Sequence, residues 1–464
     1  MKQTKLNLEQ LKVEEDEFAN GAQQLLKAPM SLSPLGKVPS KPMLSDAHYT
    51  RSCSMFNCFD YSRCSLLSGL PVFVYGLERN LSVFNLNEFI KSSVFQALSG
   101  SAYLTSNPDS ACVYLVIVGE MSSQESPQSI ERKINTLSHW NGDGTNHVLL
   151  NLARSRTSFD IFHGVNIGRA IIVQSSFVET SFRNKYDIIV PPLLGNSDGD
   201  VWTELTSLNP IRRNIFLSFD GQFVDISNLA SQDPENRGDT FKSRNLHAAV
   251  EMHQATKNIN EVSKDLFNLE VSIVQHLKSI QTDAKENVNL NFMCENVNMT
   301  GINGEWAVCG DMSRRAGLLK QSTFSIIIAP ANTSVVSTTV FQARVFESLQ
   351  AGAVPVILGS HAELPYSELL DWSRAVITLP KQRVTELYFL LRTYSNIDIM
   401  ELKRNGRMFW ETYFGTTRSV VSTLLAILRT RLNIPARPVP EVPSVSAVSN
   451  FIPVPQHIGK SLMV

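Results

Sequence analysis

Two charged residues, Arg344 and Glu347, are the strongest candidates for chemistry in this sequence. They stand three positions apart in FQARVFESLQAGAVPVI, residues 341–357, and this spacing places them on one face of a helix. An arginine can hold a phosphate with two parallel hydrogen bonds, and a carboxylate one turn on can accept both hydroxyls of a ribose. A Ser/Thr-rich turn precedes the helix, where backbone amides and the helix dipole favour an anion. The pattern predicts a cradle for a nucleoside diphosphate.

The same spacing also fits an ordinary ion pair on a helix surface, which stabilises a helix by only a few tenths of a kcal/mol. The strand-like AGAVPVI that follows favours the nucleotide site. His147 stands at the mouth of a predicted strand, after Trp140, Gly142 and Gly144. It either faces a ligand cleft or makes a hydrogen bond inside the fold, and the sequence leaves both open.

Other catalytic and metal-binding motifs are weak or missing. The sequence holds no GxGxxG after a strand, no GxxxxGK, no HExxH and no GxSxG, each of which would indicate a different chemistry. Asp198-Gly-Asp200 resembles a metal-binding DxD, but SDGD between two loops is more typical of a turn. We expect no metal.

Short apolar runs show which elements position these residues. Between residues 71 and 192 they are continuous and β-branched, and helix-length polar stretches separate them; the runs are 71–75, 111–119, 146–152, 169–174 and 186–192. Continuous rather than alternating runs predict a parallel sheet covered on both faces. A second set follows, with strands over 212–221, 322–330, 354–359 and 375–380, and helices over 340–352, 385–394 and 400–432.

Two successive sets of this kind predict an α/β fold of two facing doubly wound, Rossmann-like domains with a long C-terminal helix. We expect the domains over 53–208 and 209–432, with a helical insertion at about 222–290 that carries one or two exposed helices. Residues 1–52 are expected to be a stem remnant and linker, and 433–464 a loose tail. Ligands of such folds bind at the carboxyl ends of the strands, here between the domains.

Composition excludes several classes of protein. The 464 residues include 42 Lys and Arg against 43 Asp and Glu, with 43% hydrophobic and 18% charged residues, which is a globular balance. No apolar run approaches the ~20 residues of a membrane helix. A formal net charge of −1 without a long basic run argues against nucleic-acid binding.

Cysteines and acceptor sequons indicate an oxidising compartment. We predict disulfides for Cys53, Cys58 and Cys64, and a bridge that closes a loop between Cys294 and Cys309; metal ligation and free thiols are the alternatives. Cys112 lies inside an apolar run and is expected to be a plain core thiol. Sequons at Asn80, Asn298 and Asn332 predict N-glycosylation. The first residues carry no apolar core of a signal peptide, so we expect that a membrane anchor is missing from this chain.

Several segments together resemble the exostosin family of glycosyltransferases (family 47), and in particular its exostosin-like members. They are CFDYSRC (58–64), PVFVY (71–75), HWNGDGTNHVLLNL (139–152), GRAIIVQSSFVETSFRNKYDIIVPP (168–192) and ARVFESLQAGAVPVILGSHAELPYSELLDWS (343–373). Arg183, Asp187 and Pro191 hold the family's spacing in the fourth segment. The resemblance covers roughly residues 53–432.

The resemblance implies a glycosyltransferase B-type fold that needs no metal cofactor. It implies an inverting transfer from a UDP-sugar to a glycosaminoglycan acceptor during heparan sulfate synthesis, in the lumen of the endoplasmic reticulum and Golgi. Carried over, Arg344 would hold the diphosphate and Glu347 the ribose, and His147 would join them if it faces the cleft. A cleft carboxylate would act as general base, and the sequence does not identify it. Partners would be a second copy or other exostosin-family proteins.

Two departures from the family pattern support a rival hypothesis. Before the helix the chain reads SIIIAPAN, residues 325–332, where the family has a Cys and a Pro-x-Gly turn, and glycine lets a backbone approach a phosphate closely. The family resemblance also implies a second transferase domain, which this sequence lacks. The rival is a degenerate module that serves as a folding and dimerisation scaffold. A third hypothesis, a cytosolic nucleotide-binding protein, conflicts with the sequons and clustered cysteines.

Overall fold

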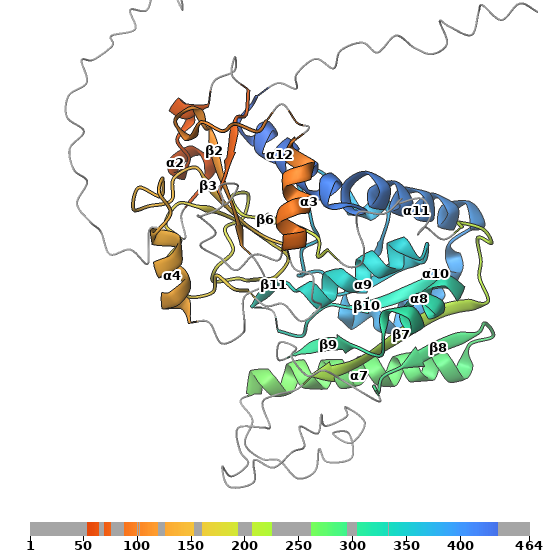
Figure 1. The fold of residues 1–464 in the computed structure, drawn as a ribbon. Coiled ribbons are helices and arrows are strands. Elements are labelled where there is room, and N and C mark those ends of the chain that lie inside the picture. Colours follow the sequence, from red (N-terminus) through yellow and green to blue (C-terminus); the bar gives the residue numbers. More distant parts are fainter. Residues whose placement is uncertain are drawn as a thin grey trace, which may run out of the picture. The chain divides into compact units, whose positions relative to one another are not determined.

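The computed structural model describes residues 53–64, 69–75, 88–99, 101, 103–118, 126–152, 160–193, 207–224, 261–294, 304–332 and 334–434. Two parallel sheets with flanking helices organise these residues (Figure 1). The predicted stem and nearly all of the predicted tail lie outside the described ranges.

The first sheet contains five parallel strands in the order β1-β2-β3-β4-β6. Their bounds are Val72–Val74, Val113–Val118, His147–Asn151, Ile171–Gln174 and Ile188–Ile189, so each predicted run contains one strand. Alternate side chains of β2 enter two cores: Leu115 packs with the face that carries α3 (Glu88–Ser99), and Val116 packs with the face that carries α4 (Pro127–Asn135). Both faces are covered, as the continuous apolar runs predict.

The second sheet follows the order β13-β12-β10-β7-β8, all parallel, and β9 pairs antiparallel with β7. Its strands are β7 (Ile215–Val224), β8 (Val288–Asn291), β9 (Glu305–Val308), β10 (Ser322–Ile328), β12 (Val354–Leu358) and β13 (Ile377–Leu379). Its helices are α7 (Glu261–Asp283), α8 (Met312–Gln321), α9 (Thr339–Gln350), α10 (Leu387–Thr393) and α11 (Asn396–Phe409). The strand order reverses between β7 and β10, and ligands of doubly wound sheets bind beyond the strand ends at such a point.

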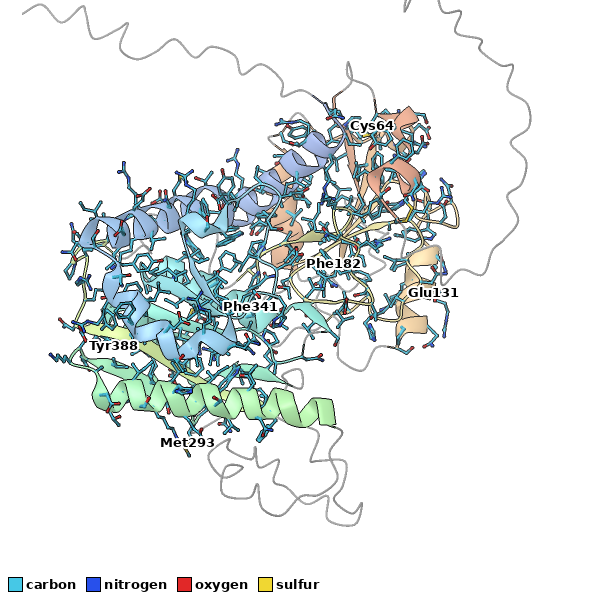
Figure 2. All side chains as sticks on the ribbon, turned by 180° about the vertical axis from the view of Figure 1, so that it is seen from behind. Cys64, Glu131, Phe182, Met293, Phe341 and Tyr388 are labelled. Carbon is cyan, nitrogen blue, oxygen red and sulfur yellow. A yellow bond between two sulfur atoms is a disulfide. The ribbon has the colours of Figure 1, made fainter. Side chains whose placement is uncertain are left out.

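Helix α9 is buried almost all round, because it packs between the second sheet and other elements of the core. Phe341 of α9 is 1% exposed and lies in the interior, whereas Met293 projects from the surface (Figure 2). Along β10, Ile326 and Ile328 join the cluster that contains α7, and Ile327 joins the cluster that contains α9.

A two-stranded antiparallel sheet joins the segment after β4 to the loop before α9. It consists of β5 (Phe177–Val178) and β11 (Val335–Ser337). Beside it, Ser175 and Thr339 share a hydrogen bond of 2.9 Å between their hydroxyls. The carboxyl end of β4 therefore lies against the amino end of α9.

The predicted single helix over 400–432 is wrong. Helix α11 ends at Phe409, a turn of π-helix covers Trp410–Phe414, and α12 (Thr417–Arg431) begins afresh. Thr416 caps α12 by accepting from the amide of Ser419 at 3.0 Å. The break lets α12 leave the second sheet and pack against α3 of the first (Figure 1).

The predicted insertion with exposed helices is wrong for its described part, residues 261–290. One face of α7 is buried through Val271, Ile273, Val274 and Leu277, and β8 is a strand of the sheet. The apolar stripe of α7 is narrow because Glu270 is also buried, in an ion pair with Lys381. Because a glutamate occupies this core-facing position, a count of apolar residues alone does not reveal that the helix faces the core.

All six cysteines form disulfides, Cys53–Cys58, Cys64–Cys112 and Cys294–Cys309. The predicted Cys294–Cys309 bridge is confirmed, although the segment it closes includes strand β9. The prediction of a free thiol at Cys112 is wrong. Cys112 is fully buried just before β2, in an apolar setting that gave no sign of a disulfide. Its partner Cys64 is labelled in Figure 2. None of the described helices has both the length and the apolarity to cross a bilayer.

Candidate functional site

The amino end of α9 lies beyond the carboxyl end of β10, at the edge where the sequence predicts a phosphate site. Thr338 caps the helix by accepting from the amide of Phe341 at 3.0 Å, and its hydroxyl also donates to Glu305. Gln342 donates to the carbonyl of Ser175 at 2.9 Å. Protein groups thus surround the first turn of the helix.

Arg344 is buried, with 8% of its surface exposed. Its guanidinium donates to the carbonyls of Asp220 at 3.0 Å, Trp306 at 3.2 Å and Ala307 at 2.7 Å. Its Nε is buried without a hydrogen-bond partner among the described residues. Burial lowers the pKa of Arg344 to about 10, a value at which the group is still a cation at neutral pH. Arg344 is therefore a buried positive charge held mainly by backbone oxygens.

Gly221 makes room for this arrangement. A Cβ at this position would lie 2.2 Å from Nη2 of Arg344 and 2.9 Å from the carbonyl oxygen of Ala307. Both distances are far below van der Waals contact, so a side chain at this point of β7 would displace the guanidinium.

Glu347 forms a bidentate ion pair with Arg315 of α8. Nε of Arg315 lies 2.9 Å from Oε2 of Glu347, and Nη2 lies 3.1 Å from Oε1. Arg315 also donates to the carbonyls of Cys309 and Gly310. Both carboxylate oxygens of Glu347 therefore accept hydrogen bonds from within the protein, and a ribose would have to share or replace them.

A cavity of about 30 Å³ lies between β7, β10, α8 and α9 beside these charges. Its walls include Asp220, Arg315, Arg344, Glu347 and Ser348. A cavity of this size holds about one water molecule and is far smaller than a nucleotide. Arg344 and Glu347 both line this cavity, within a compact network of opposite charges, and their role in holding a nucleotide stays a prediction.

His147 belongs to the first sheet and lies at the amino end of β3. It is fully buried and stacks on Tyr114 with 4.8 Å between ring centres. Its Nε2 lies 3.1 Å from the hydroxyl of Tyr75, and its Nδ1 lies 3.0 Å from the carbonyl oxygen of Thr145. Of the two alternatives that the sequence leaves open, these contacts match the hydrogen bond inside the fold, and His147 is not brought to Arg344.

Burial lowers the pKa of His147 to about 4, compared with about 6.5 in an unfolded chain. Between these values the unfolded state binds a proton that the folded state excludes, so stability falls as pH falls from 6.5 to 4. We expect His147 to account for a loss of up to about 3 kcal/mol over this interval. Denaturant unfolding at pH 7 and pH 4.5 should show a smaller pH dependence in His147→Phe than in the wild type. The exposed His163→Phe is the control, and equal pH dependence in all three proteins would contradict the assignment.

A buried carboxylate at the carboxyl edge of the first sheet was missed by the sequence reasoning. Asp160 accepts from Nε2 of Gln174 at 2.6 Å, from the amides of Phe162 and Val178 at 3.1 Å each, and from the hydroxyl of Ser181. Four donors occupy its oxygens, so it fixes the turn after β4. Burial raises its pKa.

The remaining predicted site residues lie on the surface or outside the described ranges. Asn332 is half-buried, and its side-chain oxygen accepts from the amide of Ser334 at 3.0 Å; its glycosylation stays a prediction. Asn80, Asn298 and the Asp198–Asp200 motif lie outside the described residues. No group of three potential metal ligands occurs in the part of the chain that the structure describes.

Comparison with known proteins gives one family match and many related sequences. The model of the Exostosin GT47 domain matches residues 66–394. Exostosin-2 of Homo sapiens is 25% identical over 399 residues, which cover 82% of this chain and 47% of that protein. Exostosin-1c of Danio rerio is 27% identical over 405 residues, covering 84% of this chain and 48% of its own length. This chain therefore spans about half the length of these relatives.

Among solved structures, Anabaena HepE in complex with UDP-glucose matches with a TM-score of 0.33 and 12% sequence identity. The match covers 68% of this chain and 78% of that one.

Proposed function

Because the chain belongs to the exostosin GT47 family, we propose that it transfers a sugar from a UDP-sugar to a growing glycosaminoglycan. The observation that carries the proposal is the extent of the family match. Residues 66–394 include every strand of both sheets and the whole of α9. The proposal thus concerns the complete pair of sheets and the strand ends between them, where ligands of doubly wound folds bind.

The donor would bind at the carboxyl ends of β7 and β10, with its diphosphate near the amino end of α9. The helix dipole and the cation of Arg344 favour negative charge there. Glu347 would accept hydrogen bonds from the ribose hydroxyls. An acceptor hydroxyl must lose its proton as it attacks the anomeric carbon, and a carboxylate in the cleft would take that proton. The proposal includes no bound metal, as the family resemblance implies.

The resemblance to the exostosin family also suggests a wider setting for the proposal. We infer a role in heparan sulfate synthesis in the lumen of the endoplasmic reticulum or Golgi, with N-linked glycans on the acceptor asparagines. Three disulfides support an oxidising compartment. A complex with a second copy or with other exostosin-family proteins belongs to the same proposal.

One specific observation favours the second candidate function, a scaffold without donor binding. The guanidinium of Arg344 and the carboxylate of Glu347 are already bonded to protein groups, and the cavity beside them has room for about one water molecule. In an inactive module such a pair would be retained for stability alone.

Calorimetric titration of the purified protein with UDP and UDP-sugars distinguishes the two functions. A working donor site should bind UDP with micromolar affinity, and Arg344→Lys and Arg344→Ala should weaken binding at least tenfold, which is about 1.4 kcal/mol. Arg418→Ala, an exposed arginine on α12, is the matched control. A folded protein that does not bind millimolar UDP would refute the transferase proposal and leave the scaffold.

A further inference from the structure

A groove lies on the second sheet at the edge opposite the candidate donor site. It consists of two neighbouring pockets that share Arg374, Glu401 and Asn405, with volumes of about 390 Å³ and 530 Å³. Ile211, which precedes β7, and Arg374, which precedes β13, line it, so the groove lies at the amino ends of these strands. Its volumes fall in the range of small-molecule sites.

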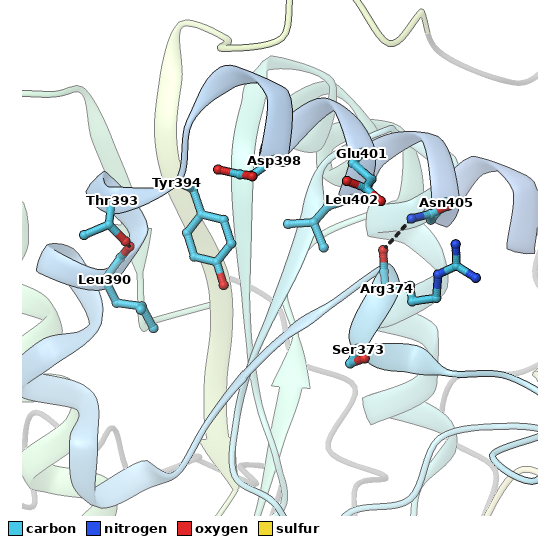
Figure 3. A pocket seen from close by; sticks show the side chains of 9 residues that line it. All are labelled: Ser373, Arg374, Leu390, Thr393, Tyr394, Asp398, Glu401, Leu402 and Asn405. Carbon is cyan, nitrogen blue, oxygen red and sulfur yellow. Dashed lines mark hydrogen bonds between the residues drawn. The ribbon is translucent and has the colours of Figure 1, made fainter.

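The walls of the groove are held in place by hydrogen bonds. These join α11 and its preceding turn to the chain that enters β7 and β13: Arg212 to Asn396 at 2.7 Å, Arg212 to the carbonyl of Tyr394 at 2.7 Å, Lys403 to the carbonyl of Ile211 at 2.8 Å, and Asn405 to the carbonyl of Arg374 at 3.1 Å. Figure 3 draws the last of these bonds. A preformed groove lowers the entropy cost of binding a ligand.

The larger pocket combines two cations and the carboxylate of Glu401 with an apolar floor. Arg374 and Arg404 are exposed, and neither guanidinium takes part in a hydrogen bond or ion pair among the described residues. Ile211, Ile397 and Met400 supply the apolar surface. Two arginines without partners beside apolar groups suit a carboxylate carried on a ring, because guanidinium groups bind carboxylates bidentately.

The smaller pocket has the chemistry that suits a neutral sugar. Figure 3 shows Tyr394 between Leu390 and Leu402, with Asp398 and Glu401 on the helix above and Ser373 across the pocket. An aromatic ring offers a flat apolar surface to the C–H face of a sugar. Carboxylate and hydroxyl groups accept and donate hydrogen bonds to sugar hydroxyls. Asp398 already accepts from the amide of Ser395, so Glu401 is the carboxylate with free capacity.

We propose that this groove binds an acidic oligosaccharide, with a uronate carboxylate between Arg374 and Arg404 and the adjoining neutral sugar over Tyr394 and Glu401. An alternating acidic and neutral glycan would place its two kinds of sugar in neighbouring pockets that share Arg374 and Glu401. The identity of this glycan as the acceptor chain rests on the proposed function, whereas binding at the groove does not. The groove would hold the chain at a distance from the strand ends where the donor reacts.

The test is a calorimetric titration of the purified protein, at low salt, with a tetrasaccharide of alternating glucuronate and N-acetylglucosamine. Arg374→Ala and Arg404→Ala should each weaken binding about tenfold, as expected for a lost charged hydrogen bond. Arg418→Ala is again the control, because it removes an exposed arginine outside the groove. Both groove variants replace exposed side chains, so they should fold.

Three other outcomes would overturn the proposal. Equal binding in the groove variants and the control would place the glycan elsewhere. Equal affinity for chitotetraose, which carries no carboxylate, would remove the role of the arginines. Displacement by equimolar inorganic phosphate would indicate a nonspecific anion site only. If the protein binds the tetrasaccharide but does not bind UDP, the proposed donor site is refuted and the proposed groove stands.

Discussion

Asp187→Ala is expected to lower the free energy of unfolding by about 3–5 kcal/mol, because it leaves the buried cation of Arg183 unpaired. The two side chains are 2.6 Å apart between Nη2 and Oδ1, and both are almost fully buried. Asp187 also accepts from the amides of Ile172 and Arg183 at 2.8 Å each. The substitution therefore leaves the charge of Arg183 and two backbone amides beside β4 without their carboxylate partner.

Urea unfolding followed by circular dichroism measures this loss. Glu179→Ala removes an exposed carboxylate eight positions earlier and should change stability by less than about 0.5 kcal/mol. The double variant Arg183→Met/Asp187→Leu should recover part of the loss, since it removes both charges. A loss below about 1 kcal/mol in Asp187→Ala would show that the pair does not hold the first sheet together.

Arg344→Met is the second large effect, an expected loss of about 2–4 kcal/mol. It removes a guanidinium that satisfies the buried carbonyls of Asp220, Trp306 and Ala307, and an unsatisfied buried acceptor costs about 1–3 kcal/mol. It also removes one of the two cations near Glu347. Gly221→Ala should destabilise through the same contact, because its Cβ would lie 2.2 Å from the guanidinium.

Thermal and urea unfolding of Arg344→Met, with Arg418→Met as the exposed control, measure this effect. The result bears directly on function, since the same residue is the proposed diphosphate ligand. A loss below about 1 kcal/mol would show that the backbone contacts are dispensable and would make ligand binding the better reason for the arginine. A large loss together with unchanged UDP affinity in Arg344→Lys would show that the arginine stabilises the fold and does not hold the diphosphate.

The strands of the first sheet were predictable because each one lies within a continuous run of apolar residues. Every apolar run of the first set contains a strand, and continuous runs such as VYLVIV are buried on both faces. The order of the strands is not local information, and no strand order was predicted. Helix α7 was misjudged because an ion pair, Glu270 with Lys381, replaces part of its apolar stripe, and its partner lies 111 residues away.

The candidate site was predictable only within one helix. The spacing of Arg344 and Glu347 fixes their common face, but not what they contact. Arg315, which pairs with Glu347, belongs to another helix. Arg344 binds backbone oxygens, and contacts of this kind cannot be recognised from residue types. His147 shows the same limit: its neighbour Tyr75 is 72 residues away, so only the assembled fold decides between cleft and core.

Helix α12 has a consequence for synthesis of the chain on the ribosome. It covers α3 and supplies Arg431, which donates to the carbonyl of Tyr186 at 2.6 Å, yet it emerges roughly 230 residues after β6. At about 5–20 residues per second, the apolar face of the first sheet waits on the order of tens of seconds for its cover. We therefore expect the nascent first half to expose this face to chaperones, and substitutions in α12 should reduce the yield of folded protein more than they reduce the stability of molecules that have already folded.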